Sequence, residues 1–405
     1  MKSTVLKRSQ TNLKIREDLS VYEYPSFSED IDIIYAELNG RHPSNGFIIN
    51  KNSDETYLIY EGHGEIYLDG EVKKFEAGDI VPIKRGTKYF CVGENMKFYC
   101  AINPPWNVQQ EQVISWVDMN SFIIDWRITS NCCNKCDYCY ASTKLEQCSD
   151  DNLIIDKILQ LGCRIVCISG GEPLLDVDRV SKIIDRLYEN GVKIFLSTTG
   201  INFLENKEKF ENKIQKLSLS LDGYDDESNI LHGRAKGNFE RVIKILEYYK
   251  KHKHNFSIKI GTTLTRKNMN INTIKNMYNV IKNYPVNMWK LYEFIPENRG
   301  ADNYNLLKAK FGQIRKLKKE VNEQIKNSEI PFEILTRKSR NKSYFIIQPD
   351  GTAIIPIDIN KKCTKDVLVG NLNTDSINDI FLKWSKLAGR KQAVSNWQRR
   401  QLINN

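Results

Sequence analysis

Apolar and amphipathic segments alternate through the middle of the chain, and this alternation restricts the possible folds more than any other feature. Between residues 121 and 329, six short apolar runs are separated by longer amphipathic stretches. Strands are expected in FIIDWRIT, CRIVCIS, VKIFLST, KLSLSLDG, FSIKIGTTL and VNMWKLYEFIP, and helices near 151–161, 176–190, 238–251 and 272–282. Repeated strand–helix units predict an α/β fold with a parallel sheet, open or closed, and with functional loops at the carboxyl ends of its strands.

The preceding block has an all-β pattern. From residue 46 to 104, alternating segments and turn glycines follow one another at short spacing, which is typical of a sandwich or barrel. Separate strands are expected in GFIIN, ETYLIYEG, GEIYLDG, EVKKFEAGD, IVPIKRG, TKYFCVG and MKFYCAINP. Asp69-Gly70 predicts a two-residue hairpin turn. Consecutive prolines at Pro104-Pro105 predict the exit from this domain.

The final block predicts a hairpin around Pro349-Asp350-Gly351 and a helix near 376–386. We therefore divide the chain into three parts: 1–118, 119–330 and 331–405.

The composition indicates a globular protein with a positive surface. The formal net charge is +10, and lysines are dense between 308 and 342. This charge favours anionic partners, but nucleic-acid-binding motifs are absent, so a solvated helix face is preferred over a nucleic-acid site. No apolar run approaches the roughly 20 residues of a membrane span, and the first residues lack a secretory pattern. We expect a soluble, cytoplasmic protein that binds no membrane.

Four of the ten cysteines lie within eight residues, directly after the first strand of the middle block: Cys132, Cys133, Cys136 and Cys139. Such local clustering indicates a metal site rather than disulfides. Zinc would take four ligands, with Cys133 or Cys148 as the fourth. Thiolates are also the usual ligands of iron–sulfur clusters. Three thiolates leave one iron of a four-iron cluster open for a small molecule.

The middle block resembles the radical S-adenosylmethionine (SAM) superfamily over roughly residues 122–296. The resemblance rests on five motifs in order at strand ends: Cys132-x3-Cys136-x-Tyr138-Cys139, Ser169-Gly170-Gly171-Glu172-Pro173, Thr198-Thr199-Gly200, Ser218-Leu219-Ser220-Leu221-Asp222-Gly223 and the LYEFIP of the sixth strand. It implies a partial (β/α)6 barrel in which Cys132, Cys136 and Cys139 hold one [4Fe-4S] cluster. The spacing from Cys133 is also possible, but the superfamily signature has three residues between its first two cysteines.

The same resemblance implies a SAM-binding site. Its expected residues are Tyr138, Gly170, Gly171, Glu172, Pro173, Thr198, Ser220 and Arg234. Glycines let a backbone approach its ligand closely, and an arginine can pair with the SAM carboxylate. Each residue also has an ordinary explanation: a strand-to-helix turn for the glycines, local hydrogen bonds for the hydroxyls and a surface position for Arg234. Asp222 fits a helix cap at least as well as a catalytic role, and Cys163 and Cys167 are interpreted as core residues.

The implied reaction is reductive cleavage of SAM to methionine and a 5′-deoxyadenosyl radical, which abstracts hydrogen from a substrate. The implied partners are a low-potential electron donor of the flavodoxin or ferredoxin type and a peptide or anionic small-molecule substrate. The alternatives are an electron-transfer or structural metal protein, and a SAM-binding sensor without turnover. The first alternative explains the cysteines but not the order of the other motifs, and the intact set of three cysteines weighs against the second.

The flanking blocks resemble known domains less completely. The first resembles a cupin barrel through Glu55-x6-Gly62, Gly78-Asp79 and Gly86. Tyr89 stands where a metal histidine is usual, so we expect a binding or covering role without metal chemistry. The last block resembles a SPASM or twitch-type extension. Only Cys363 lies in that block, so no auxiliary cluster is expected; this thiol is a candidate hydrogen-atom donor, with an inert thiol as the alternative.

Overall fold

The computed structural model describes residues 5–16, 19–43, 47–69, 71–106, 111–114, 122–141, 145–147, 150–310, 312–325, 329–360 and 362–388. The chain forms two compact units, one from residues 1–120, 158–162 and 377–385, the other from 121–157, 163–376 and 386–405. The three-part division at 118 and 330 stays a prediction. Within the described ranges, no helix has the length and apolarity that crossing a membrane requires.

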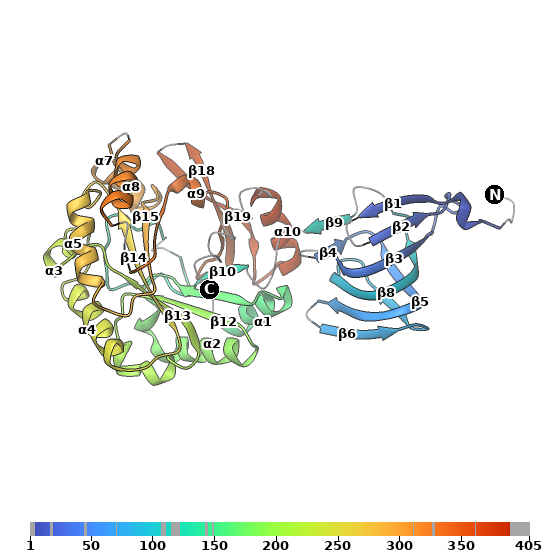
Figure 1. Cartoon of the computed structure of the whole chain (residues 1–405), viewed down its shortest axis with the longest axis horizontal. Coiled ribbons are helices and arrows are strands. Elements are labelled where there is room, and N and C mark those ends of the chain that lie inside the picture. Colours follow the sequence, from blue (N-terminus) through green and yellow to red (C-terminus); the bar gives the residue numbers. More distant parts are fainter. Residues whose placement is uncertain are drawn as a thin grey trace. The chain divides into compact units, whose positions relative to one another are not determined.

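The first unit is built on a nine-stranded antiparallel sheet (Figure 1). Its elements are the 3₁₀ helix η1 (Arg8–Gln10) and the strands β1 (Asn12–Arg16), β2 (Leu19–Glu23), β3 (Asp32–His42), β4 (Phe47–Asn50), β5 (Asp54–Leu68), β6 (Glu71–Glu76), β7 (Ile80–Ile83), β8 (Lys88–Asn103) and β9 (Glu111–Ile114). The strand order is β1-β2-β3-β8-β4-β9, and β5 pairs with β6, β7 and β8. One hydrophobic core fills this unit, with Leu38, Ile59 and Phe98 among its buried members.

Two pairs of predicted strands are single long strands in the structure, β5 and β8. The register between them shifts around Glu61, and Gly62 and Asn95 adopt positive φ angles of 83° and 49°. An extra residue in a strand reverses the side that the following side chains face. Accordingly Ile59 is buried before the irregularity and Ile66 after it. The alternation breaks there although the strand continues, which is why the predicted boundaries were wrong.

The hairpin prediction at the end of β5 is confirmed. Leu68 pairs with Glu71 across β5 and β6, so two residues connect the strands. Asp69 has a φ of 46°, a conformation that suits a tight hairpin turn, while Gly70 lies outside the described residues.

The second unit contains a ten-stranded sheet in the order β16-β15-β14-β13-β12-β11-β10-β17-β18-β19. Its strands are β10 (Ile123–Arg127), β11 (Ile165–Ser169), β12 (Lys193–Thr198), β13 (Ile214–Ser220), β14 (Ser257–Leu264), β15 (Met288–Glu293), β16 (Phe332–Leu335), β17 (Phe345–Ile347), β18 (Thr352–Asn360) and β19 (Cys363–Asn371). The six predicted strands are confirmed as β10 to β15, and their neighbours pair in parallel. The predicted hairpin is β17–β18, which pairs antiparallel.

The helices follow the predicted positions closely. They are α1 (Asp151–Leu161), α2 (Val177–Glu189), α3 (Asp226–Ile230), α4 (Asn238–Lys251), α5 (Ile271–Ile281), α6 (Arg299–Asp302), α7 (Tyr304–Leu307), α8 (Gln313–Gln324), α9 (Arg337–Arg340) and α10 (Ile377–Ala388), with 3₁₀ helices η2 (Pro173–Leu175) and η3 (Leu204–Lys209). Figure 1 shows α2, α4 and α5 along the outer side of the curved sheet. Asp176 caps α2 by accepting from Arg179 N. The buried side of α2 has helical spacing: Val180, Ile183, Ile184 and Leu187.

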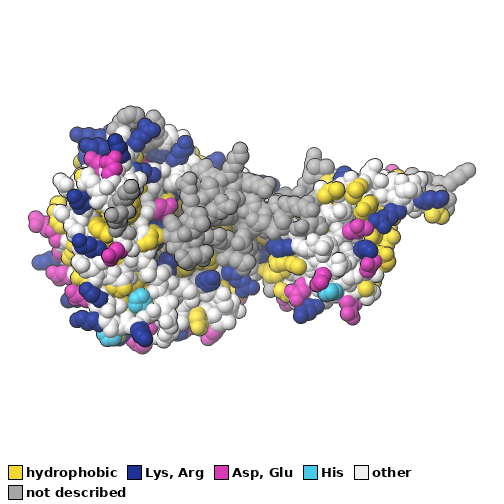
Figure 2. Space-filling view, viewed as in Figure 1, with side chains coloured by type: hydrophobic (Ala, Val, Ile, Leu, Met, Phe, Trp, Pro, Cys, Tyr) yellow, Lys and Arg dark blue, Asp and Glu magenta, His cyan; other side chains and the backbone are white. Residues whose placement is uncertain are grey.

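The lysine-rich stretch after residue 308 forms a solvated helix face. On α8, Lys316 pairs with Glu320 at 3.7 Å and Lys319 with Glu323 at 3.8 Å. Elsewhere on the face shown in Figure 2, Lys and Arg side chains are interspersed with Asp and Glu. This distribution supports the interpretation of the positive charge as a solvated surface.

Candidate active site at the strand ends

The loop after β10 places three cysteines around one cavity. This cavity of the second unit has a volume of about 340 Å³, and the cysteines that line it are Cys132, Cys136 and Cys139. Lys135 N donates to Gly233 O at 3.1 Å and Asp137 N to His232 O at 3.3 Å. A β-carbon on Gly233 would lie 2.5 Å from Lys135 O, so this close approach requires glycine. The cysteine loop is therefore held by the backbone that follows α3.

The donor set of this loop suits an iron–sulfur cluster. Thiolates are the usual ligands of such clusters, and hydrogen bonds to their sulfurs tune them. Asn134 N already donates to Cys132 Sγ at 3.4 Å. Among the described side chains, no three His, Cys, Asp or Glu stand close enough to share a single metal ion. Three thiols from one short loop reach the same cavity, so the residues present fit a cluster with three protein ligands.

Cys133 occupies a different place from its neighbour Cys132. Its sulfur lies 3.9 Å from Thr199 Oγ1, and it is not among the described residues that line the cavity. The hydrogen bond between the adjacent thiols raises the pKa of Cys132 and lowers that of Cys133. Cys148, the other spare cysteine, lies outside the described residues. Cys132 is thus the member of the adjacent pair that faces the cavity.

The glycine loop after β11 lies against the cysteine loop. Gly171 N donates to Thr129 O, and Glu172 N donates to Asn131 O, both at 2.7 Å. A β-carbon on Gly171 would lie 2.1 Å from Asn131 O, and Gly170 has a φ of 145°. Only glycine allows this contact between the two loops. The glycines therefore bring the ends of β10 and β11 together at the rim of the cavity.

Glu172 is fully buried, and its carboxylate joins its own loop after β11 to the loop after β12. It accepts from Thr198 Oγ1 at 2.6 Å, from Thr199 N at 2.6 Å and from Leu174 N at 3.0 Å. Burial raises its pKa above the ordinary value, although these donors oppose the shift. Pro173 begins η2 behind this carboxylate and is itself buried. The hydroxyl of Thr198 is consequently engaged by Glu172 rather than directed freely at a ligand.

Tyr138, Asp222 and Arg234 form a buried hydrogen-bonded triangle. Arg234 Nε donates to Asp222 Oδ2 at 2.7 Å, Arg234 Nη2 donates to Tyr138 Oη at 2.6 Å, and the Tyr138 hydroxyl donates to Asp222. Asp222 is inaccessible to solvent, and the Arg234 side chain is 9% exposed. Arg234 is therefore not a surface residue. Asp222 does not cap the following helix either, because Asp225 caps α3.

The structure brings most of the predicted SAM-site residues to this one cavity. The lining includes Tyr138, Gly170, Gly171, Glu172, Thr198, Ser220 and Arg234. Pro173 is not in the described lining, nor is Cys363, which is exposed at the start of β19. The interpretation of Cys167 as core is wrong: it lines the cavity, because Cys167 and Ser169 share the inner face of β11. Cys163 precedes the strand and is buried.

Sequence reasoning predicted Arg234 in the cavity but missed the other six basic residues there. Its lining includes seven basic side chains: Arg127, Lys216, Arg234, Lys259, Lys290, Arg299 and Arg340. The acidic side chains in the same lining are Asp125, Glu172 and Glu293. A single lysine in the middle of a strand gives no sequence signal until the strands are placed side by side. The inner surface of the sheet is therefore strongly positive.

Comparison with known proteins finds similarity over the part of the chain that carries this site. The family model described as the radical SAM superfamily matches residues 126–281. A curated relative, an S-adenosylmethionine-dependent nucleotide dehydratase from Fibrobacter sp. (strain UWH6), is 23% identical over 263 residues, which cover 58% of this chain and 78% of that protein. Four further relatives are matched over only 47% to 66% of their own length.

Two solved structures are similar to different shares of the chain. Streptococcus suis SuiB bound to S-adenosylmethionine is 16% identical and covers 63% of this chain and 64% of that chain, with a TM-score of 0.49. Pac13 from Streptomyces, a nucleoside dehydratase, is 17% identical and covers 28% of this chain and 92% of that chain, with a TM-score of 0.26.

Proposed function

We propose that Cys132, Cys136 and Cys139 hold the [4Fe-4S] cluster of a radical SAM enzyme, because the chain carries a radical SAM domain and that superfamily uses such a cluster together with SAM. The observation that carries this proposal is the opening of all three cysteines onto one cavity. Residues of the glycine loop and of the neighbouring strand ends line the same cavity. We further propose that the sheet of the second unit forms the partial (β/α)6 barrel of the superfamily, and that the first unit is cupin-like.

The residues around the cavity have distinct roles in this proposal. When bound, the cluster supplies the electron that cleaves SAM to methionine and a 5′-deoxyadenosyl radical, which takes hydrogen from the substrate. Gly170 and Gly171 let the backbone approach SAM closely. Glu172 and Thr198 fix the two strand ends on which the SAM site is built. Arg234 keeps a positive charge near the cysteines and positions Tyr138 beside Cys139.

We propose that the substrate is an anionic small molecule rather than a peptide. Seven basic side chains against three acidic ones line the cavity, and charge of one sign in a cleft concentrates ligands of the other sign. Within the described residues, Arg127 Nη2 and Arg340 Nε are buried without a hydrogen-bond partner. Buried donors without partners are costly unless a ligand satisfies them. A phosphorylated or carboxylated substrate supplies acceptors for both guanidinium groups.

The required partner of this reaction is a low-potential electron donor of the flavodoxin or ferredoxin type. Chemical reduction replaces that donor in the direct test. Anaerobically reconstituted protein, reduced with dithionite in the presence of SAM, is expected to release 5′-deoxyadenosine and methionine in equal amounts, measured by chromatography. If a verified cluster is reduced and no 5′-deoxyadenosine forms, the protein does not perform this reaction.

The substrate class predicts a specific effect at Lys259 on β14. Its Nζ lies 3.4 Å from Tyr292 Oη inside the cavity, and glutamine removes the charge of this side chain while keeping it polar. Lys259→Gln is expected to weaken binding of inorganic tripolyphosphate about tenfold, measured calorimetrically. Lys244→Gln on the exposed side of α4 is the matched control and is expected to change nothing. Equal affinity of Lys259→Gln and the unmodified protein would contradict anion binding at this position.

A further inference from the structure

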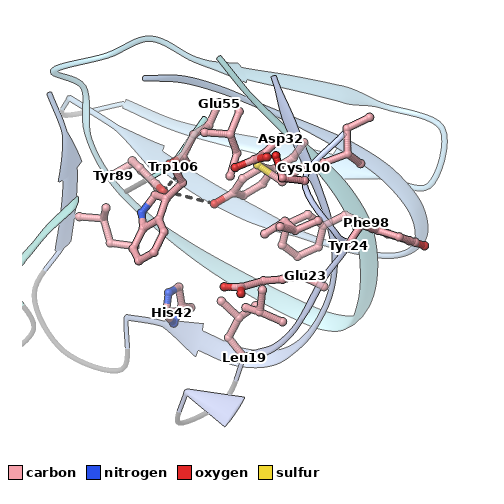
Figure 3. A pocket seen from close by; sticks show the side chains of 18 residues that line it. Leu19, Glu23, Tyr24, Asp32, His42, Glu55, Tyr89, Phe98, Cys100 and Trp106 are labelled. Carbon is pink, nitrogen blue, oxygen red and sulfur yellow. Dashed lines mark hydrogen bonds between the residues drawn. The ribbon is translucent and has the colours of Figure 1, made fainter. Parts of the chain in front are cut away.

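The first unit contains a cavity of its own, inside its antiparallel sheet (Figure 3). Its volume is about 220 Å³, which exceeds the roughly 150 Å³ of a cavity that encloses benzene. Aromatic and aliphatic side chains form much of the wall, including Val21, Phe98 and Trp106. In Figure 3 the Trp106 ring stands on one side and Glu55 projects toward the interior. The cavity can therefore hold a small ring-shaped molecule.

A relay of hydrogen bonds ends on a buried carboxylate in this cavity. Tyr57 Oη donates to Tyr89 Oη at 3.4 Å, and Tyr89 Oη donates to Glu55 Oε2 at 2.6 Å. Asn50 Nδ2 donates to Glu55 Oε1 at 2.9 Å. Burial raises the pKa of both tyrosines well above the ordinary value, so both keep their protons. Because the donors point along the relay, the remaining lone pairs on its oxygens are acceptors.

The charge of this cavity is opposite to that of the cavity in the second unit. Its lining includes three carboxylates, from Glu23, Asp32 and Glu55, and in the part of the chain that the structure describes it includes no Lys or Arg. Glu23 is paired with the half-exposed Lys14 at 2.7 Å, and the carboxylate of Glu55 accepts from Tyr89 and Asn50 inside the cavity. Three carboxylates in a described lining that includes one histidine, His42, and no Lys or Arg disfavour an anionic ligand. They favour a ligand that offers hydroxyl or amino protons.

We propose that this cavity binds a neutral small molecule with several hydroxyl groups on a ring, that is, a sugar unit, free or within a nucleoside. The acceptors of Glu55 and the relay receive its hydroxyl protons, and the aromatic wall packs against its C–H face. In such a site, carboxylate and tyrosine oxygens contact the ligand. One of these tyrosines, Tyr89, stands where a cupin barrel usually has a metal histidine. The site is separate from the proposed radical chemistry, because its lining residues all belong to the first unit.

Equilibrium binding to the 405-residue chain without a cluster tests this proposal independently of SAM cleavage. The probes are D-glucose, D-ribose and adenosine, together with glucose 6-phosphate, ribose 5-phosphate and adenosine monophosphate. Saturating inorganic tripolyphosphate is present throughout, to fill anion sites elsewhere. At least one neutral probe is expected to bind with a Kd of about 1 mM or lower, and its phosphate at least about tenfold more weakly. Binding of adenosine but not ribose would identify the nucleoside as the source of the sugar.

Two variants connect that binding to the cavity. Glu55→Gln is expected to weaken binding of the neutral probe at least about tenfold, because a charged acceptor is lost. Tyr89→Phe removes the hydroxyl that donates to Glu55 and is also expected to weaken binding of the neutral probe. Glu61→Gln, an exposed carboxylate on the same strand, is the control and should bind as the unmodified protein does. The proposal is overturned if no neutral probe binds, if the phosphates bind equally well, or if folded Glu55→Gln and Tyr89→Phe bind normally.

Discussion

Cys136→Ala is expected to abolish both the iron–sulfur chromophore and the release of 5′-deoxyadenosine. Cys136 is buried at 7% exposure in the middle of the cysteine loop. Besides its two partners, the described cavity lining has one more thiol, Cys167, which stands on β11 and not in that loop. A cluster left with two protein ligands is not retained, because thiolates supply the attachment. The measurement is the visible absorption spectrum after anaerobic reconstitution, followed by product analysis with SAM and dithionite.

The adjacent pair provides the matched control for that experiment. Cys132→Ala is expected to lose the cluster as well, whereas Cys133→Ala should retain both colour and SAM cleavage, because Cys133 contacts Thr199 instead of the cavity. The opposite result, in which Cys133→Ala loses the cluster and Cys132→Ala retains it, would show that Cys133 is the first ligand in place of Cys132. Retention of a full cluster in Cys136→Ala would refute the three-cysteine site itself.

Asp222→Asn is expected to destabilise the second unit by about 3–5 kcal/mol, because it leaves the Arg234 guanidinium buried without its counter-charge. Asp222 is inaccessible to solvent, and it also accepts Thr263 N at 2.8 Å, so the charge cannot be replaced by water. The free energy of unfolding is measured by urea denaturation at neutral pH. The control is Asp178→Asn, whose exposed pair with Lys209 at 2.8 Å should leave stability unchanged.

The difference in unfolding free energy between the unmodified protein and Asp222→Asn depends on pH, because the pKa of the Asp222 carboxyl is shifted. Burial opposes ionisation of Asp222, but attraction to Arg234 and His232 outweighs it and holds the pKa below the ordinary value. A lowered native pKa stabilises the fold above the unfolded pKa of about 4, and the stabilisation is lost as the pH falls through the native pKa. The unmodified protein should therefore exceed Asp222→Asn in unfolding free energy by a constant amount from pH 5 to 8. This difference should shrink only below about pH 4. A difference that vanishes near neutral pH would contradict the buried ion pair.

Most of the parallel sheet could be predicted because apolar residues fill the packed face of its strands, as in β14, where buried and half-buried residues alternate. The runs that become β10 to β15 are apolar and bounded by turn residues, so their existence does not depend on the register. The first unit was harder, because β1 to β3 carry many polar residues on their outer side and were not predicted at all. In β5 and β8, an irregularity reverses the alternation inside one strand. Local periodicity cannot distinguish such an irregularity from a turn.

The candidate site was predictable only where it is continuous in sequence. The cysteine loop and the glycine loop each carry their own pattern. Lys259 and Arg340 carry none, because their place in the cavity depends on which strands become neighbours. The sequence left a surface position open for the predicted SAM-site residue Arg234, because its partners, Asp222 and Tyr138, come from other segments. The meeting of Glu55 and Tyr89 likewise depends on the pairing of β5 with β8.

The pairing of β17 with β10 has a consequence for how the protein is made. Ile124 of β10 is in register with Phe345 of β17, so the strand that leads into the cysteine loop gains its second neighbour only from the far end of the sequence. Long-range pairings of this kind form slowly. A nascent chain on the ribosome must keep the β10 edge unpaired until the C-terminal hairpin emerges, and in that interval the edge is open to aggregation. We therefore expect the iron–sulfur cluster to be inserted after synthesis of the chain is complete.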